Sequence, residues 1–269
     1  MRFLRIPLLL FALALAILAF GFYLRLEWAA ELWPVGYTIG LGFKFVGAIL
    51  GAGAVAVFWA AWRRELGSLV GVGIDAAVMT GPIGVWALAK ANQNQATTSL
   101  TDSSIDSGMW NFGIVMLVMA IGGIASAIFF RRYTIKDNLP TPRVVRVAFA
   151  IFVVVLGVAG VMMLAGSMRV LAWQPPPDTL FVYGCAFLGA SAYFGYGLIK
   201  PMWGNATGQL LAFLVYDLML LMPFIDFFGE VRREMLLSHI VYFALVVGSA
   251  IVAVVYCFVM PRTRIVNRK

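Results

Sequence analysis

The stretch VAFAIFVVVLGVAGVMML, from Val147 to Leu164, decides the fold class of this chain. Its 18 residues include no charged side chain, and arginines lie on both sides of it, at Arg146 and Arg169. Because an α-helix rises about 1.5 Å per residue, such a run approaches the thickness of the roughly 30 Å hydrocarbon core of a bilayer. The run is continuously apolar rather than alternating, which favours a membrane helix over a strand of a membrane barrel.

Seven further apolar runs lie before and after residues 147–164, and short polar segments separate them. We predict eight membrane spans: Ile6–Leu26, Tyr37–Trp62, Ser68–Lys90, Met109–Phe130, Val144–Leu171, Thr179–Pro201, Ala206–Phe228 and Leu236–Met260. The only long polar stretch, 91–108, is interpreted as a mobile or partner-contacting outer loop. The chain is therefore expected to be an all-α integral membrane protein.

The composition supports this class. Of the 269 residues, 62% are hydrophobic and 12% are charged, and a water-soluble domain carries roughly twice that charged fraction. The net charge of +8 comes from basic residues at the ends of the spans, where lipid head groups and membrane topology account for them. The lipid bilayer is the expected environment, and no nucleic-acid partner is expected.

The distribution of basic residues predicts the orientation. Fourteen Lys or Arg fall at the N-terminus, in the loops around 63–65, 131–146 and 200–205, and in the tail after Met260. The opposite side carries five: Arg25, Lys90, Arg169, Arg232 and Arg233. By the positive-inside rule both termini are expected in the cytoplasm. We expect a multi-pass plasma (inner) membrane protein whose first apolar helix is retained.

An internal duplication is predicted from a shift of 142 residues. Over the 49 positions from 34 to 82 this shift gives eight identities, among them Phe45 with Phe187, Gly47 with Gly189 and Asp75 with Asp217. We expect two parallel four-helix repeats related by a pseudo-twofold axis along the membrane normal. The first repeat would be residues 1–130 and the second 147–269, joined by a basic cytoplasmic linker at 131–146.

Ionisable side chains inside the bilayer are expensive and are therefore candidates for a functional site. Asp75, Asp217 and Lys44 lie within predicted spans, and Pro82 and Pro223 follow the two aspartates. A helix proline removes an N–H donor, so each would kink its helix and free a carbonyl close to an acid.

Two interpretations of the aspartates stay open. In one they bind an ion, a proton or another ligand. In the other they are protonated or hydrogen-bonded to a neighbouring helix and join the spans, with Tyr216, Ser191 or Asn111 as partners. Lys44 can also extend its ammonium group to the interface, which would make it structural.

The only histidine, His239, is a further ligand candidate near the outer end of the last span. One histidine excludes a bis-histidine haem site within the chain. No metal-ligand cluster and no catalytic motif is present in the sequence, so we predict neither a metal site nor catalytic residues.

The leading hypothesis is a non-enzymatic membrane subunit or scaffold that contacts other subunits, a second copy, or a hydrophobic ligand such as lipid, quinone or pigment. The alternative is a small transporter or channel for a cation, a proton or a small solute that uses Asp75 and Asp217. A lipid-directed enzyme with Asp217 or His239 as general base is a third hypothesis.

Overall fold

The computed structural model describes residues 2–36, 40–97 and 103–265, and this part of the chain is mostly helical. Eight helices are long and apolar enough to cross a membrane, as predicted. They are α1 (Arg2–Tyr23), α3 (Gly40–Arg63), α4 (Leu69–Thr97), α5 (Ser103–Phe130), α6 (Arg143–Leu164), α7 (Pro177–Ile199), α8 (Trp203–Phe227) and α9 (Leu236–Val254). The described chain also contains four short helical segments: α2 (Glu27–Ala30), η1 (Leu66–Ser68), η2 (Arg233–Met235) and η3 (Val255–Val259).

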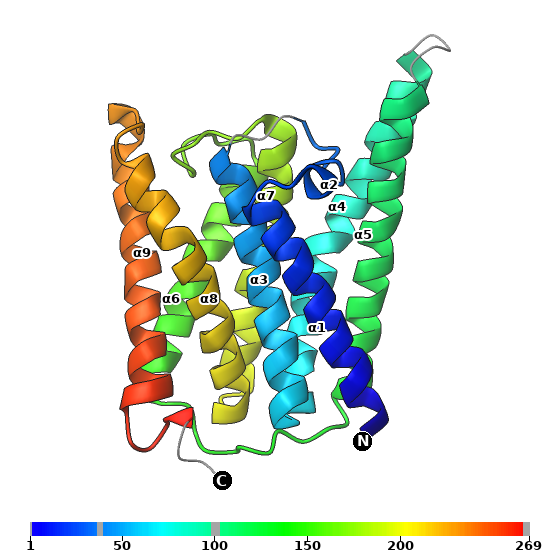
Figure 1. Cartoon of the computed structure of the whole chain (residues 1–269). Coiled ribbons are helices and arrows are strands. Elements are labelled where there is room, and N and C mark those ends of the chain that lie inside the picture. The colour runs from blue at the N-terminus through cyan, green and yellow to red at the C-terminus, as the bar shows by residue number, and fades with distance from the viewer. Residues whose placement is uncertain (1, 37–39, 98–102, 266–269) are drawn as a thin grey trace.

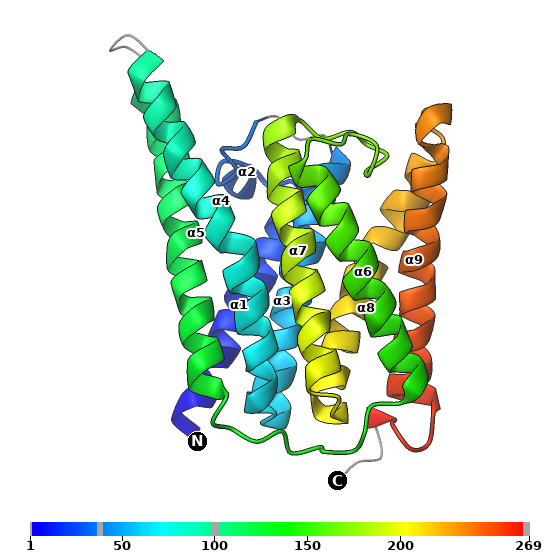
Figure 2. The same cartoon turned by 180° about the vertical axis from the view of Figure 1, so that it is seen from behind.

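The eight long helices form an inner and an outer group (Figures 1 and 2). In α3, α4, α7 and α8, 44–56% of the apolar span is buried, against 17–28% in α1, α5, α6 and α9. Each outer helix packs on one inner helix, in the pairs α1 with α3, α5 with α4, α6 with α7 and α9 with α8. The inner helices then pack across the molecule, α3 on α8 and α4 on α7.

Glycines allow the closest of these contacts. A Cβ added at Gly73 of α4 would lie 2.5 Å from the carbonyl oxygen of Gly123 in α5. The same relation holds between α6 and α7, where a Cβ at Gly160 would lie 2.9 Å from the carbonyl oxygen of Gly184. Because lipid supplies no hydrophobic force between helices, such close van der Waals packing stabilises the bundle.

The segment between α5 and α6 crosses the end of the bundle at which both ends of the described chain lie (Figure 1). The buried Glu65 carboxylate accepts the backbone N–H groups of Lys136 at 2.7 Å and Asp137 at 3.1 Å. Farther along, the N–H of Trp203 donates to the carbonyl of Leu139 at 2.7 Å. This strap, residues 131–142, is therefore bonded to the α3–α4 turn and to the α7–α8 turn.

At the other end of the bundle, α4 and α7 are joined by side chains. Lys90 of α4 and Asp178, in the first turn of α7, form a partly exposed ion pair. Next to it, the Thr179 hydroxyl donates to the carbonyl of Val35 at 3.0 Å. Polar contacts therefore connect the inner helices at this end as well.

The structure differs from the prediction at the end of the fifth span and in the outer polar stretch. The fifth span was expected to reach Leu171, but α6 ends at Leu164 because Gly166 adopts a φ of +81° and the Ser167 N–H closes back onto the carbonyl of Met162. Glycine at this position ends a helix readily.

The outer polar stretch is mostly helical, since α4 continues to Thr97 and α5 begins at Ser103; residues 98–102 lie outside the described part. The α4–α5 pair projects beyond the other helices (Figure 1).

Candidate functional site

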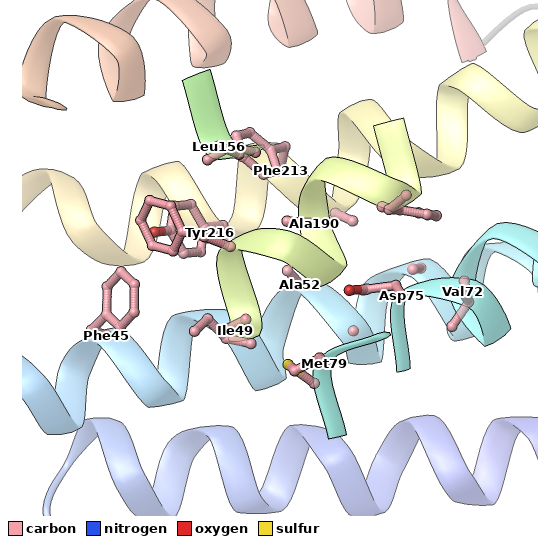
Figure 3. Close-up of a pocket in the computed structure, with 16 residues that line it drawn as sticks. Phe45, Ile49, Ala52, Val72, Asp75, Met79, Leu156, Ala190, Phe213 and Tyr216 are labelled. Atoms are coloured by element: carbon pink, nitrogen blue, oxygen red, sulfur yellow. The ribbon is translucent and has the colours of Figure 1, made fainter. Parts of the chain in front are cut away.

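A cavity of about 80 Å³ lies among the inner helices, with one contribution from α6. Its wall is built from small and apolar side chains, five aromatic rings and one carboxyl group (Figure 3). The lining residues are Phe45, Ile49, Ala52, Gly53, Ala56, Val72, Asp75, Met79, Leu156, Ala186, Phe187, Ala190, Tyr193, Ala212, Phe213 and Tyr216. Of these described residues, Asp75 alone carries an acidic or basic side chain.

The position of Asp75 is fixed by the contact between α4 and α7. A Cβ at Gly189 of α7 would lie 2.5 Å from Asp75 Oδ1 and 2.9 Å from the Asp75 carbonyl oxygen. The absence of a side chain at Gly189 therefore lets the acid lie directly against α7. Figure 3 shows the carboxyl group directed into the cavity, between the helices that carry Ala52 and Ala190.

No hydrogen-bond donor or basic side chain within the described ranges pairs with the Asp75 carboxyl group. A charged carboxylate among apolar side chains is costly unless a cation or several donors accompany it. Asp75 is thus an acid that has no partner among the described residues.

Asp217, the second predicted acid, is held differently. It is 1% exposed, and the Ser249 hydroxyl of α9 donates a hydrogen bond of 2.5 Å to its Oδ2. The neighbouring Tyr216 lines the cavity with its ring, while its hydroxyl is hydrogen-bonded to that of Tyr242 in α9. These contacts join α8 to α9, and Asp217 does not line the cavity.

The two prolines lie inside their helices, as expected. Pro82 is exposed on the outside of α4 and takes no part in the cavity wall. Pro223 is buried, and the carbonyl that it leaves without a helical donor, that of Met219, accepts a hydrogen bond of 2.9 Å from the Tyr23 hydroxyl of α1. The freed carbonyl in α8 therefore serves a contact between helices.

Lys44 and His239 lie apart from the cavity. The Lys44 ammonium is 6.0 Å from the centre of the Tyr23 ring, on the side of α3 that packs against α1. His239 is buried in α9, and its Nε2 lies 3.0 Å from the carbonyl oxygen of Phe224. The structure does not bring the four predicted ligand candidates together, since Asp75 alone reaches the cavity.

Sequence reasoning missed two features. The partner of Asp217 is Ser249, whereas Ser191 donates to the Val153 carbonyl at 2.8 Å and Asn111 is exposed. Ser249 could have been identified from the sequence as a hydrogen-bonding residue, because a hydroxyl in the middle of an apolar helix needs an acceptor. The aromatic wall of the cavity could not be predicted from the sequence, because Phe and Tyr occur in most of the spans and no pattern marks those that line the cavity.

Searches for similarity found no matching protein family, no matching characterised protein and no matching solved structure. No group of three or more His, Cys, Asp or Glu that would suit a metal ion occurs among the described residues. Functional inference therefore depends on the cavity itself.

Proposed function

We propose that this protein is a small membrane transporter for a cation, with Asp75 as the charged group of the binding site. The observation that carries the proposal is the unpaired Asp75 carboxyl group in a cavity among the inner helices. Transporters commonly bind their substrate near the middle of the membrane, at the interface between two repeats. Asp75 lies nine residues after Leu66, where its span begins, and so well inside that span.

The predicted pseudo-twofold repeat is part of this proposal. The pairs α1–α3 and α4–α5 in the first half have counterparts in α6–α7 and α8–α9, and α4–α7 has its counterpart in α8–α3. Residues on a twofold axis contact their own equivalents. Phe45 and Phe187, which the 142-residue shift aligns, stack with ring centroids 6.0 Å apart. Both line the cavity, which favours a site on the axis.

The size of the cavity favours a small solute over the lipid, quinone or pigment of the other hypothesis. Pockets for drug-sized ligands measure roughly 300–1,000 Å³, and this cavity is about 80 Å³. A quinone ring with its tail, or a pigment, would need the inner helices to separate.

The orientation in the proposal follows the charges. Basic residues gather at the end of the bundle that carries the strap and the chain ends, so we assign that end to the cytoplasm and the protein to the plasma membrane. In this assignment Lys90 and Asp178 lie at the outer end.

Flux into proteoliposomes tests the proposal. Wild-type protein is reconstituted, and uptake of radioactive sodium, radioactive rubidium and radiolabelled methylammonium is measured, with proton entry followed by a trapped pH dye. We expect uptake of at least one of these cations, reduced roughly tenfold in Asp75→Asn. Asp217→Asn is the matched control, because it makes the same chemical change in an acid that Ser249 holds, and its flux should stay near wild type. Absence of all four fluxes, or equal flux in Asp75→Asn, would contradict the proposal.

A second candidate is the subunit or scaffold role, favoured by the α4–α5 pair that extends beyond the bundle (Figure 1). A helical projection of this kind offers a surface to another protein. Native mass spectrometry after purification in mild detergent is the test. A stoichiometric partner would support this role, and a bare monomer would contradict it.

A further inference from the structure

We propose that the Asp75 cavity selects a small organic ammonium ion, a protonated amine bearing short alkyl groups. This inference rests on the proposed function and names its substrate class. It comes from the chemistry of the wall, in which one acid lies among aromatic and apolar side chains. The rings belong to Phe45, Phe187, Tyr193, Phe213 and Tyr216.

The wall suits an ammonium ion because it offers two kinds of attraction. The Asp75 carboxylate pairs with the positive charge, and aromatic rings attract cations through the negative potential of their faces. The alkyl groups of the ion contact Ile49, Met79 and Leu156, which a hydrated inorganic cation would not do favourably. Each part of the ion therefore meets a matching part of the wall.

The same wall is poorly suited to a bare metal ion. Calcium takes six to eight oxygen ligands, and magnesium demands a near-octahedral set. Besides Asp75, the side-chain oxygens of the lining residues are the hydroxyls of Tyr193 and Tyr216, and the Tyr216 hydroxyl is already bonded to Tyr242. A dehydrated metal ion would keep only part of its coordination shell.

Alanines set the size limit. Ala52, Ala56, Ala186, Ala190 and Ala212 lie around the cavity, and larger side chains at these positions would fill it. The space of about 80 Å³ suits methylammonium or dimethylammonium and excludes a bulky cation such as tetraphenylphosphonium.

Binding and flux together test the substrate class. Binding of methylammonium, dimethylammonium, tetraphenylphosphonium, sodium and potassium to the full chain in lipid nanodiscs is measured by isothermal titration calorimetry. We expect the two small ammonium ions to bind and the other three not to. Binding should weaken roughly tenfold in Asp75→Asn and about two- to fivefold in Phe213→Leu, because each cation–π contact contributes modestly. Phe213→Tyr keeps the ring and should bind as the wild type does.

Variants that unfold are recognised by size-exclusion chromatography, and Ala190→Val gives an independent test. It adds two methyl groups to the cavity wall without changing charge, and should weaken dimethylammonium binding more than methylammonium binding.

The failure of this inference differs from the failure of the proposed function. Flux of sodium, rubidium or protons that depends on Asp75, without ammonium binding, would overturn the substrate class and leave the transporter proposal standing. Ammonium binding that depends on Asp75, without any flux, would support the substrate class and overturn transport. Equal ammonium binding in Asp75→Asn, or in Phe213→Leu, would overturn the inference.

Discussion

Replacing Gly189 by alanine should disrupt the contact that holds Asp75 in place. The added Cβ would lie 2.5 Å from Asp75 Oδ1, and 2.9 Å from both the Asp75 carbonyl oxygen and Met79 Cβ. The carboxyl group can rotate away, but the other two atoms are fixed to the α4 backbone. Ordinary contact begins at 3.4 Å, so α4 and α7 must separate by 3.4 − 2.9, or about 0.5 Å.

The free energy of this change has two opposing parts. Overpacking costs about 1–3 kcal/mol, while alanine in place of glycine inside a helix gains up to about 1 kcal/mol. We therefore expect Gly189→Ala to lower the free energy of unfolding by about 1–2 kcal/mol. Gly195→Ala is the matched control on the same helix, because a Cβ there meets no atom within 4 Å, and it should be neutral or stabilising.

Equilibrium unfolding in mixed micelles of dodecyl maltoside and SDS measures the difference between the two variants. Cation flux in proteoliposomes gives a second readout, because moving α4 also moves Asp75, and flux should fall in Gly189→Ala alone. Equal unfolding free energies for Gly189→Ala and Gly195→Ala would contradict a close contact of α4 and α7 beside Asp75.

Three further perturbations have defined outcomes. Tyr23→Phe should destabilise the protein by about 1 kcal/mol in the same titration. The effect should be much smaller in a Pro223→Ala background, because the alanine N–H can donate to the Met219 carbonyl that Tyr23 otherwise bonds. Equal effects of Tyr23→Phe in the two backgrounds would contradict this link between Tyr23 and Pro223. Glu65→Ala should release the strap and speed trypsin cleavage after Lys136, and an unchanged cleavage rate would count against it. Arg64 follows the last residue of α3 and has a φ of +61°. Arg64→Gly should therefore stabilise the protein by about 0.5–1 kcal/mol, and a loss of stability in the titration would contradict backbone strain at this position.

The sequence predicts the membrane helices well because their signal is local. A continuous apolar run such as 147–164 has one stable state in lipid, in which its own backbone satisfies every hydrogen bond. The helix ends are less predictable, since they depend on single residues. Gly166 ends α6 at Leu164, before the predicted boundary at Leu171, and the polar end of α4 continues as helix to Thr97.

The site was predictable only in part. Asp75 was identified because an acid inside a span is rare, but nothing in the sequence distinguished its role from that of Asp217. What separates the two is the neighbouring helix: α7 presents Gly189 to Asp75, and α9 presents Ser249 to Asp217. Which helices become neighbours is a property of the packed bundle, and no single span encodes it.

The strap across the chain-end face has a mechanical consequence. Because Glu65 bonds it to the α3–α4 turn and Leu139 bonds it to the start of α8, the strap joins these two parts of the molecule at this end of the bundle. A rigid half that pivots about a fixed edge moves least beside that edge and most at the far rim. The contact between Lys90 and Asp178 therefore lies where any tilting of one half against the other would open the widest gap.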